Sequence, residues 1–235
     1  MTAALLEADS VGVHFGGVVA VADVSLTIAG NGITCIIGPN GAGKSTFFNM
    51  LTGTVRPSTG RVLVGGHDIT GSRIETFAHR GIARKFQTPS VFERLTVREN
   101  LDIARHPAAA TAAKTIDLIL SLLGLDAVAG TPAGALAHGQ KQWLEIGMAL
   151  ATEPKLMLLD EPTAGMGPEE TEKTARLVTD LAGRMAIVVI EHDMAFIRAL
   201  AARTLVMHHG KVVADGSFAE IEGDALVRDI YLGRR

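Results

Sequence analysis

A glycine-rich loop between a short apolar run and a helix constrains the fold of this chain more than any other feature. Residues 38–46 read GPNGAGKST and match the pattern G-x-x-x-x-G-K-[ST]. The β-branched run at 32–37 predicts a buried strand before the loop, and 44–51 predicts a helix after it. Because the pattern binds phosphate in this strand, loop, helix context, the sequence predicts an α/β unit that holds a nucleotide.

Each residue type in the loop suits phosphate chemistry. Glycines let backbone N–H groups converge on phosphate oxygens, and the helix N-terminus adds a favourable dipole. Lys44 is placed to reach the terminal phosphates, and Ser45 supplies an oxygen to Mg²⁺. The alternative is a glycine-rich turn that precedes a lysine by chance, and the flanking strand and helix argue against it. The residues assigned to a triphosphate and its metal are Gly38, Pro39, Asn40, Gly41, Ala42, Gly43, Lys44, Ser45 and Thr46.

The second half of the chain repeats the alternation of strand and helix. Apolar runs at 155–159 and 185–190 predict strands, and 169–181 between them predicts a helix. Pro168 and the two glutamates after it suit the start of that helix. Strands that are apolar throughout are typical of a mostly parallel sheet with both faces covered, which indicates an α/β fold.

Two regions depart from this alternation. Residues 5–15, 21–28 and 61–64 predict strands separated by turns, which indicates a small antiparallel layer on the nucleotide side. Residues 88–150 show helical spacing with no convincing strand, and we expect a helical insert there. Its alanine-rich stretch at 107–113 fits either a linker or a helix start. The helices expected in the insert are 96–104, 113–123 and 140–150.

Composition excludes several classes of protein. The 235 residues carry 22 Lys and Arg against 25 Asp and Glu, a net charge of −3, so no overall positive field attracts nucleic acid. Aromatic residues make up 4%, too few for single-strand stacking platforms. A single cysteine, Cys35, excludes internal disulfides and suits the reducing cytoplasm. No stretch approaches the ~18 apolar residues of a membrane-spanning helix, so any link to a membrane goes through a partner.

Two carboxylates follow the apolar run at 155–159. Ligands bind at the carboxyl ends of parallel strands, and Asp160 there can hold the shell of a Mg²⁺ ion. Glu161 can orient and polarise an attacking water for in-line phosphoryl transfer. The alternative is a plain acidic turn before Pro162, and the phosphate loop upstream favours the metal and base roles.

With these motifs in place, residues 136–140 resemble the LSGGQ signature of the ATP-binding subunits of ABC transporters. The resemblance covers essentially the whole chain. It implies a P-loop NTPase, a RecA-like ABC ATPase core at 1–87 and 151–235 with an antiparallel β subdomain, and an α-helical subdomain at 88–150. It also implies a head-to-tail dimer in which one subunit's signature caps the ATP of the other. The signature residues are Leu136, Ala137, His138, Gly139 and Gln140.

The signature departs from the family pattern at two positions. Ala137 stands where serine is usual and His138 where glycine is usual. The lost hydroxyl contact is worth about 1 kcal/mol, so we expect a weakened cap on the phosphate. His138 fits either a contact to phosphate or partner, or a solvated loop histidine. Gly139 permits close backbone approach, and a simple helix-capping loop is the alternative for the whole segment.

Three further residues take roles that the resemblance implies. Gln87 resembles the glutamine that senses Mg²⁺ and the attacking water and joins the two lobes. His192 resembles the switch histidine that contacts the γ-phosphate and steadies the catalytic glutamate. Phe15 occupies the place of the adenine-stacking aromatic, with a core phenylalanine as the alternative. His208 and His209 are expected in a hairpin.

Other segments resemble one branch of the family. Residues 164–167 lack the aspartate that usually ends the D-loop, which makes communication between subunits through that carboxylate doubtful. This form, with Asn100 and the ending at 231–233, resembles importers of branched-chain amino acids, amides and urea. Residues 136–148 most resemble the urea importer ATPase, so urea is favoured over branched-chain amino acids.

The resemblance also implies partners and a location. The partners are integral membrane permease subunits, a second ATPase subunit that is identical or a sister chain, and indirectly a solute-binding protein. The location is the cytoplasmic side of the membrane, bound peripherally. Three alternatives stay open: a kinase or GTPase on the same loop, a non-transport ABC ATPase, and a catalytically weak regulatory cassette.

Overall fold

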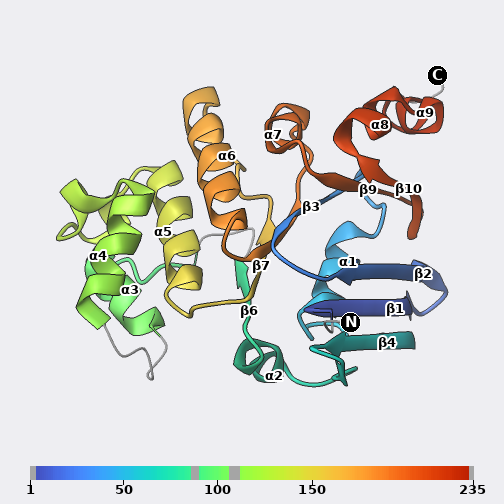
Figure 1. The fold of residues 1–235 in the computed structure, drawn as a ribbon, viewed down its shortest axis with the longest axis horizontal. Helices are drawn as coiled ribbons and strands as arrows, with labels where there is room; N and C mark the ends of the chain where they lie inside the picture. The colour runs from blue at the N-terminus through green and yellow to red at the C-terminus, as the bar shows by residue number, and fades with distance from the viewer. Residues whose placement is uncertain (1–3, 86–89, 106–111, 233–235) are drawn as a thin grey trace.

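The computed structural model describes residues 4–85, 90–105 and 112–232, which form two sheets and the helices around them (Figure 1). The larger sheet has the strand order β10-β9-β3-β8-β7-β6, with parallel pairing from β9 through to β6. Every residue of β7 and β8 is buried, because helices cover one face of this sheet, and a helix together with the smaller sheet covers the other. The strands are β3 (Gly32–Ile37), β6 (Ile82–Lys85), β7 (Leu156–Asp160), β8 (Ala186–Ile190), β9 (Arg203–His208) and β10 (Lys211–Ser217).

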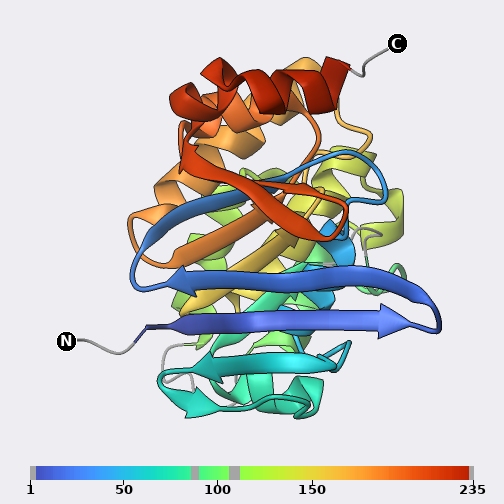
Figure 2. The same cartoon turned by 90° about the vertical axis from the view of Figure 1, so that its right-hand side faces the viewer.

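The smaller sheet is antiparallel, with the order β2-β1-β4-β5 (Figure 2). Helix α1 (Lys44–Leu51) shares one apolar cluster with both sheets, and its Phe47 and Phe48 are fully buried in that cluster. This packing seats the loop before α1 between the two sheets. The strands are β1 (Leu6–Phe15), β2 (Val18–Ile28), β4 (Thr59–Val64) and β5 (His67–Asp68).

Helices form a second apolar cluster on the opposite face of the larger sheet. In Figure 1, α3, α4 and α5 lie together at the far end from the small sheet, and α6 stands between them and α7. The described part of 97–150 contains helices and 3₁₀ turns but no strand. The helices are α2 (Ile74–His79), α3 (Val97–Ala104), α4 (Ala112–Leu123), α5 (His138–Leu150), α6 (Pro168–Ala182), α7 (Met194–Leu200), α8 (Phe218–Gly223) and α9 (Ala225–Leu232).

The structure confirms the predicted α/β architecture, with small shifts at element ends. Strand 32–37 and helix 44–51 match their predictions. The strand predicted to end at residue 159 includes Asp160, because this residue still pairs with Ile190. Helix α5 begins before Gln140, since the Gln140 side chain accepts a hydrogen bond from the Ala137 N–H at 3.0 Å and caps the first turn.

Other sequence predictions have mixed outcomes. Helix α4 begins at Ala112, so the end of the alanine-rich stretch is a helix start, while 107–111 lies outside the described residues. His208 and the turn after it belong to the predicted hairpin of β9 and β10.

The pKa of the Cys35 thiol is raised to about 12, first by burial and then by the negative charge of Glu191. In the described part of the chain, no helix has the length and apolar character needed to span a membrane.

Candidate functional site

The loop between β3 and α1 is shaped by glycines that no other residue could replace without strain. Gly38, Gly41 and Gly43 have φ angles of 151°, 78° and 97°. A Cβ at Gly38 would lie 2.2 Å from the Met207 carbonyl oxygen, and a Cβ at Gly43 would lie 2.4 Å from that of Ala20. Left-handed backbone and close approach both require glycine here, so the loop can curl around a ligand.

Lys44 lies folded into this loop. Its Nζ donates hydrogen bonds to the carbonyl oxygens of Gly38 at 2.7 Å and Pro39 at 3.0 Å, and its side chain is buried. Burial lowers the pKa of Lys44, and the nearby carboxylates of Glu161 and Asp160 act in the opposite direction. A cation thus stands beside both acidic residues of the predicted site.

The start of α1 is open to an anion. Gly43 precedes the helix and offers no side-chain cap, and Ser45 in the first turn is exposed. The uncapped N–H groups and the helix dipole favour phosphate oxygens. The described residues contain no group of three His, Cys, Asp or Glu that would hold a metal alone. The Ser45 hydroxyl is an oxygen ligand of the kind that Mg²⁺ takes.

Asp160 lies at the carboxyl end of β7 and is paired with Arg84 of β6. The Arg84 guanidinium donates to Asp160 Oδ2 at 3.0 Å, and both side chains are nearly buried. Arg84 also donates to the Asn49 Oδ1 of α1 at 2.6 Å, so it ties the acidic strand to the helix after the loop. Burial raises the pKa of Asp160, and Arg84 counteracts that shift.

Glu161 follows in a strained backbone conformation. Its φ of 44° is in the left-handed region, and its N–H donates to the Ile190 carbonyl at 2.9 Å. Strain of this kind is held by surrounding structure and collects at functional sites. His192 Nδ1 lies 3.6 Å from Glu161 Oε1, so the predicted base and the predicted switch histidine are neighbours.

Glu191 is a site residue that the sequence analysis missed. Its carboxylate is buried and accepts hydrogen bonds from the N–H and hydroxyl of Thr163 and from the N–H groups of His192 and Asp193. It therefore joins the loop after Glu161 to the loop that carries His192. The sequence signal that could have identified Glu191 is an acidic residue directly after an apolar strand.

Phe15 lies at the end of β1 with its side chain 53% exposed. The alternative of a core phenylalanine is therefore wrong. An exposed ring at this position remains available to stack on a base. Gln87, for which a catalytic and metal role was predicted, lies outside the described residues.

The signature residues lie apart from the glycine loop, at the start of α5. His138 Nε2 lies 2.9 Å from the Ala164 carbonyl oxygen, so this nitrogen carries the proton and donates. His138 is exposed to solvent, as the second alternative expected, but it begins helix α5 and does not lie in a loop. A Cβ at Gly139 would lie 2.3 Å from Glu170 Oε1, so the expected close approach is to the N-terminal turn of α6.

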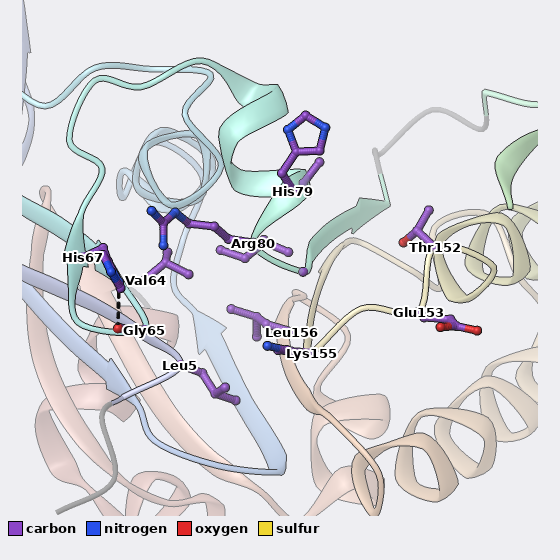
Figure 3. A pocket seen from close by; sticks show the side chains of 13 residues that line it. Leu5, Val64, Gly65, His67, His79, Arg80, Thr152, Glu153, Lys155 and Leu156 are labelled. Atoms are coloured by element: carbon purple, nitrogen blue, oxygen red, sulfur yellow. Dashed lines mark hydrogen bonds between the residues drawn. The ribbon is translucent and has the colours of Figure 1, made fainter. Parts of the chain in front are cut away.

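Two cavities of about 470 Å³ lie away from the glycine loop. The first is at the amino ends of β6 and β7, and no predicted site residue lines it. In Figure 3, His67 and Arg80 lie on one side of it and Glu153 on the other. The second lies between α2, β6 and α5. Its lining includes Ile74, Phe77, Arg84, Ser90, Glu145 and Met148.

Comparisons with curated proteins agree with this geometry. Residues 21–164 match the family model described as ABC transporter. BraF of Pseudomonas aeruginosa and LivG of Salmonella typhimurium, both named high-affinity branched-chain amino acid transport ATP-binding proteins, are 33% and 34% identical over 99% of this chain and of their own. LptB of Haemophilus influenzae, named a lipopolysaccharide export system ATP-binding protein, is 34% identical over 92% of this chain and 91% of its own.

Solved structures are similar over the same length. The ADP conformation of MJ1267, an ATP-binding cassette of an ABC transporter, has a TM-score of 0.87 and 32% identity over 99% of this chain and 100% of that one. The dimeric post-hydrolysis state of the cassette MJ0796, bound to ADP and Pi, has a TM-score of 0.77 and 26% identity over 90% of this chain and 98% of that one. This chain therefore belongs to the ABC transporter family, and it binds nucleotide and hydrolyses ATP.

Proposed function

We propose that this chain is the ATP-hydrolysing subunit of an importer and that it works as a dimer. The observation that carries the proposal is the convergence of Lys44, Asp160, Glu161 and His192 on the loop at 38–46. Lys44 and the loop N–H groups would hold the phosphates, and Ser45, Asp160 and Gln87 would hold Mg²⁺. Bound Mg²⁺ neutralises charge on the phosphates.

The protein's own groups then carry the reaction. Glu161 accepts a proton from the attacking water and aims it in line with the terminal phosphate. His192 donates to that phosphate and steadies the glutamate, and Glu191 joins the two loops that present them. Phe15 stacks on the adenine.

The position of the signature supports a dimer. Ala137 and His138 are exposed at the start of α5. A second copy or a sister chain, placed head to tail, brings this surface onto the phosphates. The dimeric MJ0796 cassette supports this arrangement by its similarity.

A permease contact follows from the second cavity, between α2, β6 and α5. Apolar side chains on its lining, Ile74, Phe77 and Met148, suit a short helix of an integral membrane subunit. The chain is then peripheral, on the cytoplasmic face, and a solute-binding protein reaches it only through the permease.

The cargo proposal rests on similarity alone. Full-length matches to BraF and LivG favour uptake of a branched-chain amino acid. Urea or another amide is the second candidate, because 136–148 resembles the urea importer ATPase. The solute that raises ATPase activity in the complex reconstituted with its permease distinguishes them.

Glu161→Gln tests the catalytic proposal. We expect a loss of turnover of at least about 100-fold with ATP affinity unchanged, because the amide keeps the shape but cannot accept the proton. Lys44→Ala is the contrasting variant and should weaken equilibrium ATP binding itself. Normal hydrolysis by Glu161→Gln would contradict the assignment of the base.

A further inference from the structure

Two adjacent cations at the end of β6 face opposite sides of the larger sheet. Ile82 belongs to the apolar cluster around α1 and Ala83 packs against the cluster of α5, because strand side chains alternate. Arg84 accordingly reaches α1 and Asp160 on one side. Lys85 points to the other side and is fully buried beneath α5.

Glu145 of α5 is the partner of Lys85. Its Oε2 lies 3.5 Å from Lys85 Nζ, and its side chain is only 8% exposed. Burial lowers the pKa of Lys85, and Glu145 acts in the opposite direction. A buried ammonium of this kind depends on a carboxylate nearby.

The same carboxylate also contacts the chain beyond residue 89. The Ser90 N–H donates to Glu145 Oε1 at 3.4 Å. Glu145 therefore touches the residue before and the residue after 86–89, the segment whose sequence includes Gln87. It also lines the cavity assigned above to the permease, and it lies two helical turns after the signature residues at the start of α5.

We propose that Glu145 is a positioning residue that couples the signature helix to the strand beside the catalytic carboxylates. A displacement of the signature or of the cavity lining then reaches Lys85 and Ser90 through the Glu145 side chain. Arg84, which precedes Lys85 in β6 and donates to Asp160, passes this displacement to the carboxylate. This inference rests on the proposed function of the same site.

The test uses a charge-balanced double variant, Lys85→Met/Glu145→Leu, in the assembled transporter. We expect the thermal stability to stay near that of the wild type and ATP affinity to change less than about twofold, because no charge is left buried alone. We expect kcat to fall about tenfold or more, since Lys85 and Ser90 are no longer linked to α5. The matched control is Arg98→Gln/Asp117→Asn, which removes an exposed ion pair of the helical region and should leave kcat unchanged.

A kcat for the double variant within about twofold of the wild type would overturn the proposal. If the variant does not fold, hydrogen exchange on the otherwise unmodified Glu161→Gln protein decides. ATP should then slow hydrogen exchange both in the peptide around Ser90 and in α5. Unchanged exchange in either one of these segments would overturn the proposal. If the proposed function itself is wrong, the wild-type complex will not hydrolyse ATP, and this result distinguishes that failure from a failure of the coupling proposal.

Discussion

Asn100 is a fully buried polar residue that organises the loop before α3. Its Oδ1 accepts from the Phe92 N–H at 2.7 Å, and its Nδ2 donates to the carbonyls of Phe92, Leu95 and Thr96 at 3.1, 3.3 and 2.9 Å. The sequence offered Asn100 only as a marker of one branch of the family. Its structural role is to accept from the Phe92 N–H and to add a second donor to three carbonyls that already accept from the N–H groups of Leu95, Ala133 and Asn100.

Asn100→Ala should destabilise the fold. The Phe92 N–H would lose its Asn100 acceptor, and three carbonyls would lose the amide as a second donor, which costs about 2 to 3 kcal/mol and lowers the melting temperature by several degrees. Calorimetry measures the melting temperature of this variant and of the control Asn31→Ala. Asn31 is a suitable control because it is exposed and donates one hydrogen bond to the Gly183 carbonyl. Equal melting temperatures for the two variants would contradict the role given to Asn100.

At the scale of elements, the turn between β3 and α1 shows how backbone conformation prepares a site. Gly43 adopts a φ of 97° directly before the helix, and the Phe47 N–H donates to its carbonyl at 2.8 Å. The first turn of α1 therefore begins with no side chain between its N–H groups and a ligand. The β2 backbone and the β9–β10 turn enclose the loop from the other side.

Gly43→Ala should weaken nucleotide binding by about tenfold or more and lower stability. The added Cβ would lie 2.4 Å from the Ala20 carbonyl oxygen in a backbone region that alanine rarely adopts, so the loop must shift. Gly30→Ala is the matched control, because nothing lies within 4 Å of its Cβ position. Titration with a fluorescent ATP analogue compares the two, and equal affinities would show that the loop tolerates the change.

At the scale of the whole molecule, the glycine loop and the segment that resembles the signature lie apart in one chain. The glycine loop lies between the two sheets, while the signature begins α5 beside α6 (Figure 1). Contacts from Ala164 and Glu170 hold the signature within its own chain. The proposed head-to-tail dimer would bring the signature of one subunit to the glycine loop of the other.

ATP should therefore drive dimerisation of the Glu161→Gln variant. Light scattering is expected to show the mass double when ATP and Mg²⁺ are added, because each nucleotide is held by both subunits. The variant Lys44→Ala/Glu161→Gln should remain monomeric at the same ATP concentration. A Glu161→Gln chain that stays monomeric at saturating ATP would contradict the homodimer and leave a sister chain as the partner.

The sequence by itself determined the features that depend on short-range order. The loop at 38–46, the strand before it and the helix after it follow from local turn chemistry and periodicity, and the structure confirms them. Asp160 and Glu161 were found because an apolar strand that ends in acids is visible in one segment. The domain boundaries and the role of Gln87 stay predictions.

Only the tertiary structure decided the contacts between segments distant in the chain. The pairs Arg84 with Asp160, Lys85 with Glu145, and His138 with Ala164 form because β6 lies beside β7, α5 packs against β6, and the start of α5 meets the loop before α6. No local pattern encodes strand order, because it results from burying two apolar faces at once. The charged residues that these faces enclose then find partners, since an unpaired buried charge costs several kcal/mol, about 3 to 5 when one partner is removed.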